Sequence, residues 1–117
     1  MLIGGYAVNY YGYGRFTGDI DFWIKPDEEN KALLLKAFSN LGRNADDIKE
    51  IGKLDFAQAQ VFSIGVPPLR IDFLTRVNLV NYDEAWDKRK EWKVENYIVP
   101  VVDYEHLILT KLTTGRA

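Results

Sequence analysis

The interpretation of this chain rests on two short runs near its start, Ile3-Gly4-Gly5 and Asp19-Ile20-Asp21-Phe22. Residues two apart in a β-strand point to the same face of a sheet. If the second run is a strand, its two carboxylates share one face and its apolar side chains share the other. Like charges held together repel, and a divalent cation such as Mg²⁺, bound by carboxylate oxygens, relieves that repulsion. The second run therefore predicts a metal site, against the simpler alternative of a solvated strand end.

The paired glycines open the first predicted helix, which runs from Gly5 to about Tyr13. Glycine allows a ligand to approach the backbone closely, and the N-terminus of a helix favours an anion. A phosphate beside metal-binding carboxylates indicates phosphoryl or nucleotidyl transfer. Tyr6, Tyr10 and Tyr13 share one face of this helix, where they either cover the sheet or stack a nucleic-acid base.

Composition describes a small globular protein of ordinary character. The chain has 117 residues, of which 47% are hydrophobic and 27% charged, and this length predicts one domain. A formal net charge of -2 argues against bulk electrostatic binding of nucleic acid but leaves a local basic pocket possible. The chain has no cysteine, signal peptide or membrane-spanning apolar run, so we expect a cytoplasmic protein with no membrane partner. Both ends look abrupt, and we expect flanking elements of a longer domain to be missing.

Hydrophobic periodicity and turn signals predict the remaining elements. The expected strands are 19–25, 57–64, 69–76, 92–95 and 98–102, and the expected helices are 27–41, 46–51, 82–90 and 104–113. The second and third strands form a hairpin across the turn at 65–68. Asp27 is expected to cap its helix, whose apolar face is predicted to comprise Leu34, Ala37, Phe38 and Leu41.

A third carboxylate, Asp72, lies between Ile71 and Phe73 in another predicted strand. If that strand neighbours the first, three carboxylates converge. Three carboxylates suffice for a two-metal site, in which ions roughly 3.5–4 Å apart activate the attacking oxygen and stabilise the leaving one. The alternative for Asp72 is an ion pair with Arg70, which lies on the same face of the strand.

Three basic residues are candidates for binding phosphate, namely Arg15, Lys111 and Arg116. Arginine matches phosphate oxygens in a bidentate way, whereas lysine acts as a point charge. Lys111 lies within the apolar stripe of the last helix, where an unpaired lysine is rare. For all three, ordinary solvation at the surface is the competing interpretation.

Two further polar residues carry weaker expectations. Thr17 either orients Asp19 or Asp21 through its hydroxyl or makes a turn. His106 is the only histidine, and it is expected to be an exposed helix residue.

Taken together, these motifs resemble the nucleotidyltransferase superfamily typified by DNA polymerase β. The resemblance is carried by Ile3-Gly4-Gly5, Asp19-Ile20-Asp21-Phe22 and Ile71-Asp72-Phe73. The longer runs Gly4-Gly5-Tyr6-Ala7-Val8 and Gly14-Arg15-Phe16-Thr17-Gly18, with the terminal run 107–116, are most similar to the small prokaryotic branch. That branch includes toxin-like nucleotidyltransferases of AbiEii type.

The resemblance implies an α/β fold with a short mixed sheet and helices mainly on one side. It implies transfer of a nucleoside monophosphate from an NTP to an acceptor, with two Mg²⁺ ions or Mn²⁺ in their place. Asp19, Asp21 and Asp72 would be the catalytic metal ligands. The expected nucleotide-binding residues are Gly4, Gly5, Arg15, Thr17 and Lys111.

The sequence leaves the acceptor and the partners open. The acceptor could be RNA such as tRNA, a protein side chain or a small molecule. One alternative is an inert relative that binds a nucleotide or a partner protein, for example within a toxin–antitoxin pair. Another is a structural domain whose acids form ordinary ion pairs. A homodimer is also compatible with the sequence.

Overall fold

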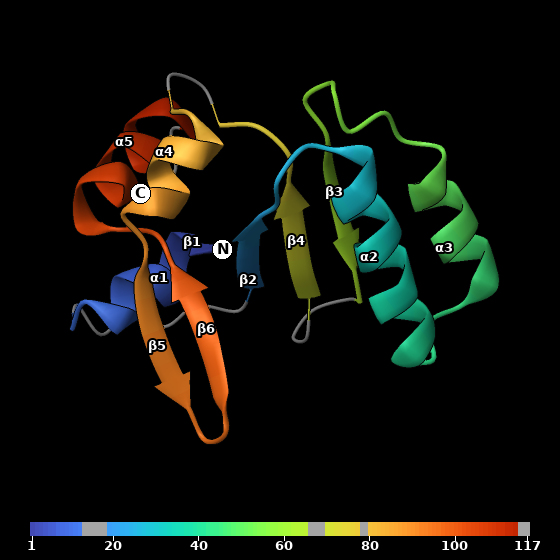
Figure 1. Ribbon diagram of the computed structural model, residues 1–117, viewed down its shortest axis with the longest axis horizontal. Coiled ribbons are helices and arrows are strands. Elements are labelled where there is room, and N and C mark those ends of the chain that lie inside the picture. The colour runs from blue at the N-terminus through green and yellow to red at the C-terminus, as the bar shows by residue number, and fades with distance from the viewer. Residues whose placement is uncertain (13–18, 66–69, 78–79, 115–117) are drawn as a thin grey trace.

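The computed structural model describes residues 1–12, 19–65, 70–77 and 80–114, with side chains as far as residue 110. These residues form a six-stranded mixed sheet, in the order β3-β4-β2-β1-β6-β5, and five helices (Figure 1). The strands are β1 (Leu2–Ile3), β2 (Asp19–Trp23), β3 (Val61–Ile64), β4 (Arg70–Leu74), β5 (Lys90–Val94) and β6 (Tyr97–Val101). The helices are α1 (Gly4–Tyr10), α2 (Glu28–Asn40), α3 (Ala45–Gly52), α4 (Tyr82–Asp87) and α5 (Tyr104–Thr114).

Strands β2 and β4 are parallel neighbours within the sheet, and β3 is antiparallel to β4 as the predicted hairpin requires. Strand β1 is antiparallel to β2 and parallel to β6. The two acidic strands are direct neighbours, so the condition on which convergence of the three carboxylates depended is met. Strand β1 directly precedes the glycines, and its two residues, Leu2 and Ile3, are both buried.

Helix α2 begins as the sequence predicts, since the Asp27 side chain accepts a hydrogen bond of 2.7 Å from the backbone N–H of Asn30. Its buried face matches the prediction in part, and the predicted residue Leu34 is partly buried against the core. Phe38 is buried and Leu35 is partly buried, whereas Leu41 is 72% exposed and Ala37 is also exposed. The helix ends at Asn40 and the chain turns away through a left-handed glycine, so Leu41 does not continue the buried stripe.

Helices lie against both faces of the sheet, whereas the resemblance implied helices mainly on one side. One apolar cluster joins Phe38 of α2 and Ile51 of α3 to Phe73 of β4. A second cluster joins Trp23 of β2 to residues of α1, α4 and α5, among them Ala7. Strand β2 supports both clusters because apolar residues occupy both of its faces toward its C-terminal end.

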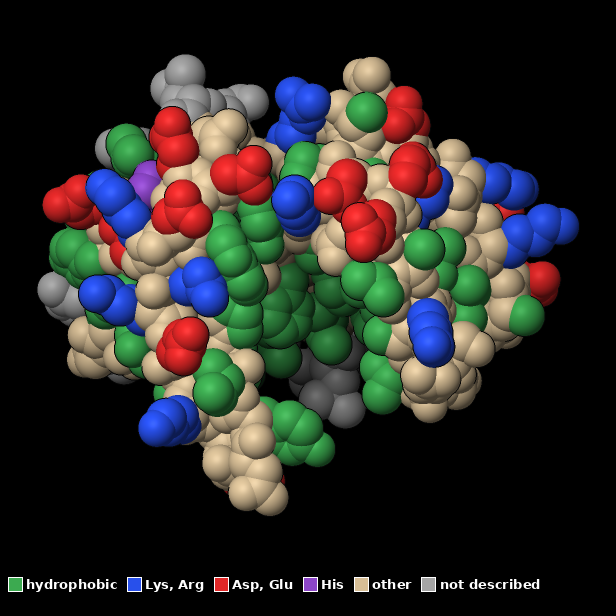
Figure 2. Space-filling view, in the orientation of Figure 1, with side chains coloured by type: hydrophobic (Ala, Val, Ile, Leu, Met, Phe, Trp, Pro, Cys, Tyr) green, Lys and Arg blue, Asp and Glu red, His purple; other side chains and the backbone are tan. Residues whose placement is uncertain are grey.

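Strands β5 and β6 form a hairpin that extends away from the helices (Figure 1). Its turn places Glu95 at a φ of +54°, and its exposed apolar residues are Val94, Tyr97 and Ile98. The molecule is hollowed between this hairpin and α2, and hydrophobic side chains line the back of the hollow (Figure 2). None of the described helices is both long enough and apolar enough to cross a membrane.

Candidate functional site

The three predicted acids come together on one face of the parallel strand pair β2 and β4. Asp21 of β2 lies directly opposite Asp72 of β4, and Asp19 lies opposite Arg70 in the same register. Asp21 is 6% exposed and Asp72 is 3% exposed, so both carboxylates are held away from bulk water. Carboxylates are rarely this buried without a compensating charge.

Arg70 provides a compensating charge. One of its terminal nitrogens donates to Oδ2 of Asp19 at 2.8 Å and to Oδ2 of Asp72 at 3.1 Å. Its Nε lies 3.0 Å from Oδ1 of Asp72, an ion-pair contact without hydrogen-bond alignment. The hydrogen bond to Asp72 raises the pKa of the Arg70 guanidinium above its usual value, and the charges of Asp72, Asp19 and Asp21 add to that rise. The ion pair that the sequence left as an alternative for Asp72 is therefore present, and it also includes Asp19.

Ser63 completes the surroundings of Asp72. It lies opposite Asp72 on the neighbouring strand β3, and its hydroxyl donates to Oδ1 of Asp72 at 2.5 Å. The sequence analysis missed this residue. The signal that could have found it is its position within the predicted hairpin, where a serine opposite an acid shares its face.

Gly4 lies against the buried carboxylate of Asp21. The pairing of β1 with β2 sets Ile3 opposite Asp21, so the first residue of α1 begins directly beside that acid. Gly4 has a φ of +70°, and a Cβ placed on it would lie 2.3 Å from Oδ2 of Asp21. Any side chain here would displace the carboxylate, so the close approach of helix and acid requires glycine.

The three carboxylates supply the oxygen ligands that Mg²⁺ prefers, and those of Asp21 and Asp72 are buried. As the described side chains are placed, no group of three or more Asp, Glu, His or Cys is arranged to hold a metal ion. Arg70 lies between Asp19 and Asp72 and supplies a positive charge in this arrangement. Metal binding by all three acids would require the guanidinium to move.

Several expected nucleotide-binding residues cannot be placed. Arg15 and Thr17 lie outside the described residues, as does Arg116, the other candidate for binding phosphate. Lys111 belongs to helix α5, but its side chain also lies outside them. Gly5 is the second residue of α1, next to the contact between Gly4 and Asp21.

Two expectations about other side chains are decided by packing. Tyr6 and Tyr10 pack against the apolar cluster around Trp23, which supports the covering role over base stacking. The expectation that His106 is exposed is wrong. Its side chain is 13% exposed and its Nδ1 contacts Oδ1 of Asp103, because α5 turns this residue toward the residue that precedes its first turn.

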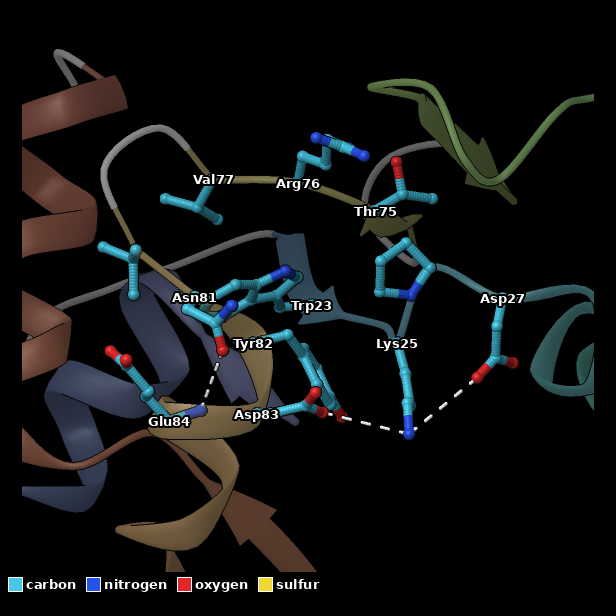
Figure 3. Close-up of a pocket in the computed structure, with 12 residues that line it drawn as sticks. Trp23, Lys25, Asp27, Thr75, Arg76, Val77, Asn81, Tyr82, Asp83 and Glu84 are labelled. Carbon is cyan, nitrogen blue, oxygen red and sulfur yellow. Dashed lines mark hydrogen bonds and ion pairs between the residues drawn. The ribbon is translucent and has the colours of Figure 1, made fainter.

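A separate pocket of about 710 Å³ lies at the C-terminal ends of β2 and β4, beside α4 (Figure 3). Lys25 and Arg76 give it two positive charges, and Asp27, Asp83 and Glu84 give it three negative ones. It contains none of the three clustered acids. Its mixed charge selects neither anions nor cations, so the pocket does not identify a ligand class.

No family model, characterised protein or solved structure matches this chain. The functional argument therefore rests on the residues and their arrangement.

Proposed function

We propose that this protein is a metal-dependent nucleotidyltransferase with a nucleotidyltransferase-like fold. It would move a nucleoside monophosphate from an NTP to an acceptor and release pyrophosphate. One observation carries the proposal. Three carboxylates, two of them buried, share one face of adjacent parallel strands, and the glycine that opens a helix lies against one of them.

In this proposal Asp19 and Asp21 hold two Mg²⁺ ions, or Mn²⁺, and Asp72 holds one of them. When bound, such ions stabilise charge on the transferring phosphoryl group and lower the pKa of the acceptor hydroxyl. Gly4 and Gly5 present backbone N–H groups to the triphosphate. Arg15 and Lys111 would neutralise phosphate charge, and the Thr17 hydroxyl would orient Asp19 or Asp21.

Arg70 and Ser63 prepare the site in the absence of nucleotide. The Arg70 guanidinium donates hydrogen bonds of 2.8 Å to Asp19 and 3.1 Å to Asp72. Its positive charge offsets the repulsion between the two carboxylates and keeps them close at neutral pH. The Ser63 hydroxyl fixes one oxygen of Asp72 and so limits the rotation of that carboxylate. The carboxylates are thereby kept close together before any ligand arrives, which reduces the cost of ordering them, although Arg70 would still have to move for all three acids to bind metal.

A second candidate follows from the same arginine. A guanidinium that already neutralises two acids removes part of the need for a metal ion, which favours an inert relative that binds a nucleotide or a partner protein. A component of a toxin–antitoxin pair would fit this description. The two candidates differ in turnover, because only the enzyme releases pyrophosphate.

The experiment is a calorimetric titration with a non-hydrolysable NTP, with and without Mg²⁺. We expect binding that needs Mg²⁺ and that is lost in Asp72→Asn. Asp83→Asn is the matched control, because Asp83 is an exposed acid in the separate pocket. Nucleotide binding that is equal in wild type and Asp72→Asn would contradict the proposed site.

Pyrophosphate release then separates enzyme from inert relative. The protein is incubated with each NTP, Mg²⁺ and one acceptor class at a time, namely tRNA, protein or a small hydroxylated molecule. Release that depends on one acceptor class and disappears in Asp72→Asn identifies the enzyme and its acceptor. Binding without release from any class supports the inert relative.

A further inference from the structure

Strand β5 forms one edge of the sheet. It pairs with β6 on one side, and no described strand pairs with its other side (Figure 1). Four of its five residues are exposed, and only Trp92 is partly buried. An unpaired edge presents a row of backbone N–H and C=O groups that another strand can complete.

The sequence of β5, Lys90-Glu91-Trp92-Lys93-Val94, is complementary to itself. If two copies pair antiparallel about Trp92, Glu91 of each lies opposite Lys93 of the other. Both charged residues point to the same face, since they are two apart in the strand. The pairing therefore creates two opposite-charge contacts, and the two Trp92 side chains meet at the axis, where cross-strand aromatic pairs are favourable.

We propose that β5 is the interface for a second copy of this chain, which joins the two sheets into one through an antiparallel β5–β5 pair. The symmetry is isologous, so the assembly closes as a dimer.

The local contacts leave β5 able to form this pair. The ion pair between Glu91 and Arg89 is 3.8 Å long and partly exposed, so exchanging it for a contact with Lys93 of the second copy loses little. Trp92 is already fixed in orientation by Tyr10 of α1, whose ring centroid lies 5.6 Å away. Little ordering of the central residue is then needed on association.

Charge also argues against pairing of β5 with β3, the strand at the other edge of the sheet. A lysine on an edge strand normally discourages pairing, and here only a strand that places an acid opposite Lys93 neutralises it. The opposite edge strand, β3, has the sequence Val61-Phe62-Ser63-Ile64 and carries no charge. Pairing of β5 with β3 would leave Glu91 and Lys93 unmatched, and it would be head-to-tail and open-ended.

The test is sedimentation velocity over a range of protein concentrations. We expect a monomer–dimer equilibrium in the wild type. Glu91→Lys sets lysine opposite lysine at both contacts, and it should weaken the dimer about tenfold or more. The double variant Glu91→Lys with Lys93→Glu has the same composition as the wild type and restores both contacts, so it should dimerise like the wild type.

Two controls make the result specific. An equal mixture of Glu91→Lys and Lys93→Glu should form a heterodimer, because the two variants carry opposite charges along the edge. Val61→Lys alters the other edge strand and should leave the dimer unchanged. A strictly monomeric wild type, a double variant as weak as Glu91→Lys, or a dimer lost in Val61→Lys would each overturn the proposal. Circular dichroism of every variant confirms that the fold is retained.

Discussion

Replacing Gly4 with alanine tests whether helix α1 and the acidic strand fit together as closely as the structure places them. The φ of +70° at Gly4 disfavours any residue with a Cβ by about 1–2 kcal/mol. The added Cβ would also lie 2.3 Å from Oδ2 of Asp21 and 3.1 Å from its Cγ. Asp21 is buried and has little room to move, and overpacking of this kind costs about 1–3 kcal/mol.

Gly42 provides the matched control. Its φ is +76°, and a Cβ placed there would meet nothing within 4 Å. Gly42→Ala therefore introduces the backbone strain without the clash. The lower entropy of the unfolded chain offsets part of that strain, so the free energy of unfolding should fall by about 1 kcal/mol. Gly4→Ala should lose about 2–4 kcal/mol. Urea unfolding followed by tryptophan fluorescence measures both changes in the free energy of unfolding.

A double-mutant cycle assigns the difference to the carboxylate. In an Asp21→Ala background the contacts with Oδ2 and Cγ are absent and only the 3.1 Å contact with the Cβ at position 21 remains, so Gly4→Ala should cost less than it does in the wild-type background. Equal losses for the two glycine variants in the wild-type background would refute the close approach. An unchanged penalty at Gly4 after removal of the Asp21 side chain would also refute it.

Three further perturbations follow from single contacts. Tyr11→Phe removes the 2.6 Å hydrogen bond to the carbonyl of Val102 and should lose about 0.5–1.5 kcal/mol in urea unfolding. Burial raises the pKa of the Tyr11 phenol from 10.0 to about 12, so the folded state retains a proton that the unfolded chain releases. Wild-type stability should therefore fall as pH rises from 10 to about 12, and fall less in Tyr11→Phe; parallel curves would contradict this. Glu95→Gly relieves the φ of +54° in the hairpin turn and should gain about 1 kcal/mol in thermal unfolding, whereas an unchanged midpoint would show that the turn is unstrained. Arg70→Met leaves the acids without their guanidinium, so its melting temperature should fall at neutral pH and recover on acidification or with Mg²⁺; a melting temperature equal to wild type would show that the ion pair is unimportant.

The strands that carry the site were predictable because their periodicity is strong. Apolar residues alternate with Asp19 and Asp21 in β2 and with Asp72 in β4, which fixes the face of each carboxylate. The pairing of these two strands depends on contacts between distant parts of the chain. Local sequence patterns therefore predicted that the acids converge only if these two strands are neighbours.

Other features depend on tertiary contacts that no local pattern reports. The contact between Gly4 and Asp21 follows from the register of β1 against β2, and β1 is too short to give a periodic signal. Helix α3 was expected only over 46–51, in a stretch that is mostly charged or polar. It extends over Ala45–Gly52 because Asn44 caps its start and Ile51 packs into the core. Phe22 and Trp23 point to opposite faces of the sheet and are both apolar, so the sequence of β2 does not show which face the helices cover. The division of the helices between the two faces therefore depends on packing.

The central claim is that the three acids form one metal–nucleotide site. Paramagnetic broadening of backbone amide resonances by Mn²⁺, in the presence of a non-hydrolysable NTP, tests this most directly. The account predicts saturable broadening that is strongest at Asp21 and Asp72, declines toward Asp83 in the separate pocket, and is greatly reduced in Asp72→Asn. Broadening centred on Asp83, or equal broadening in wild type and Asp72→Asn, would contradict it.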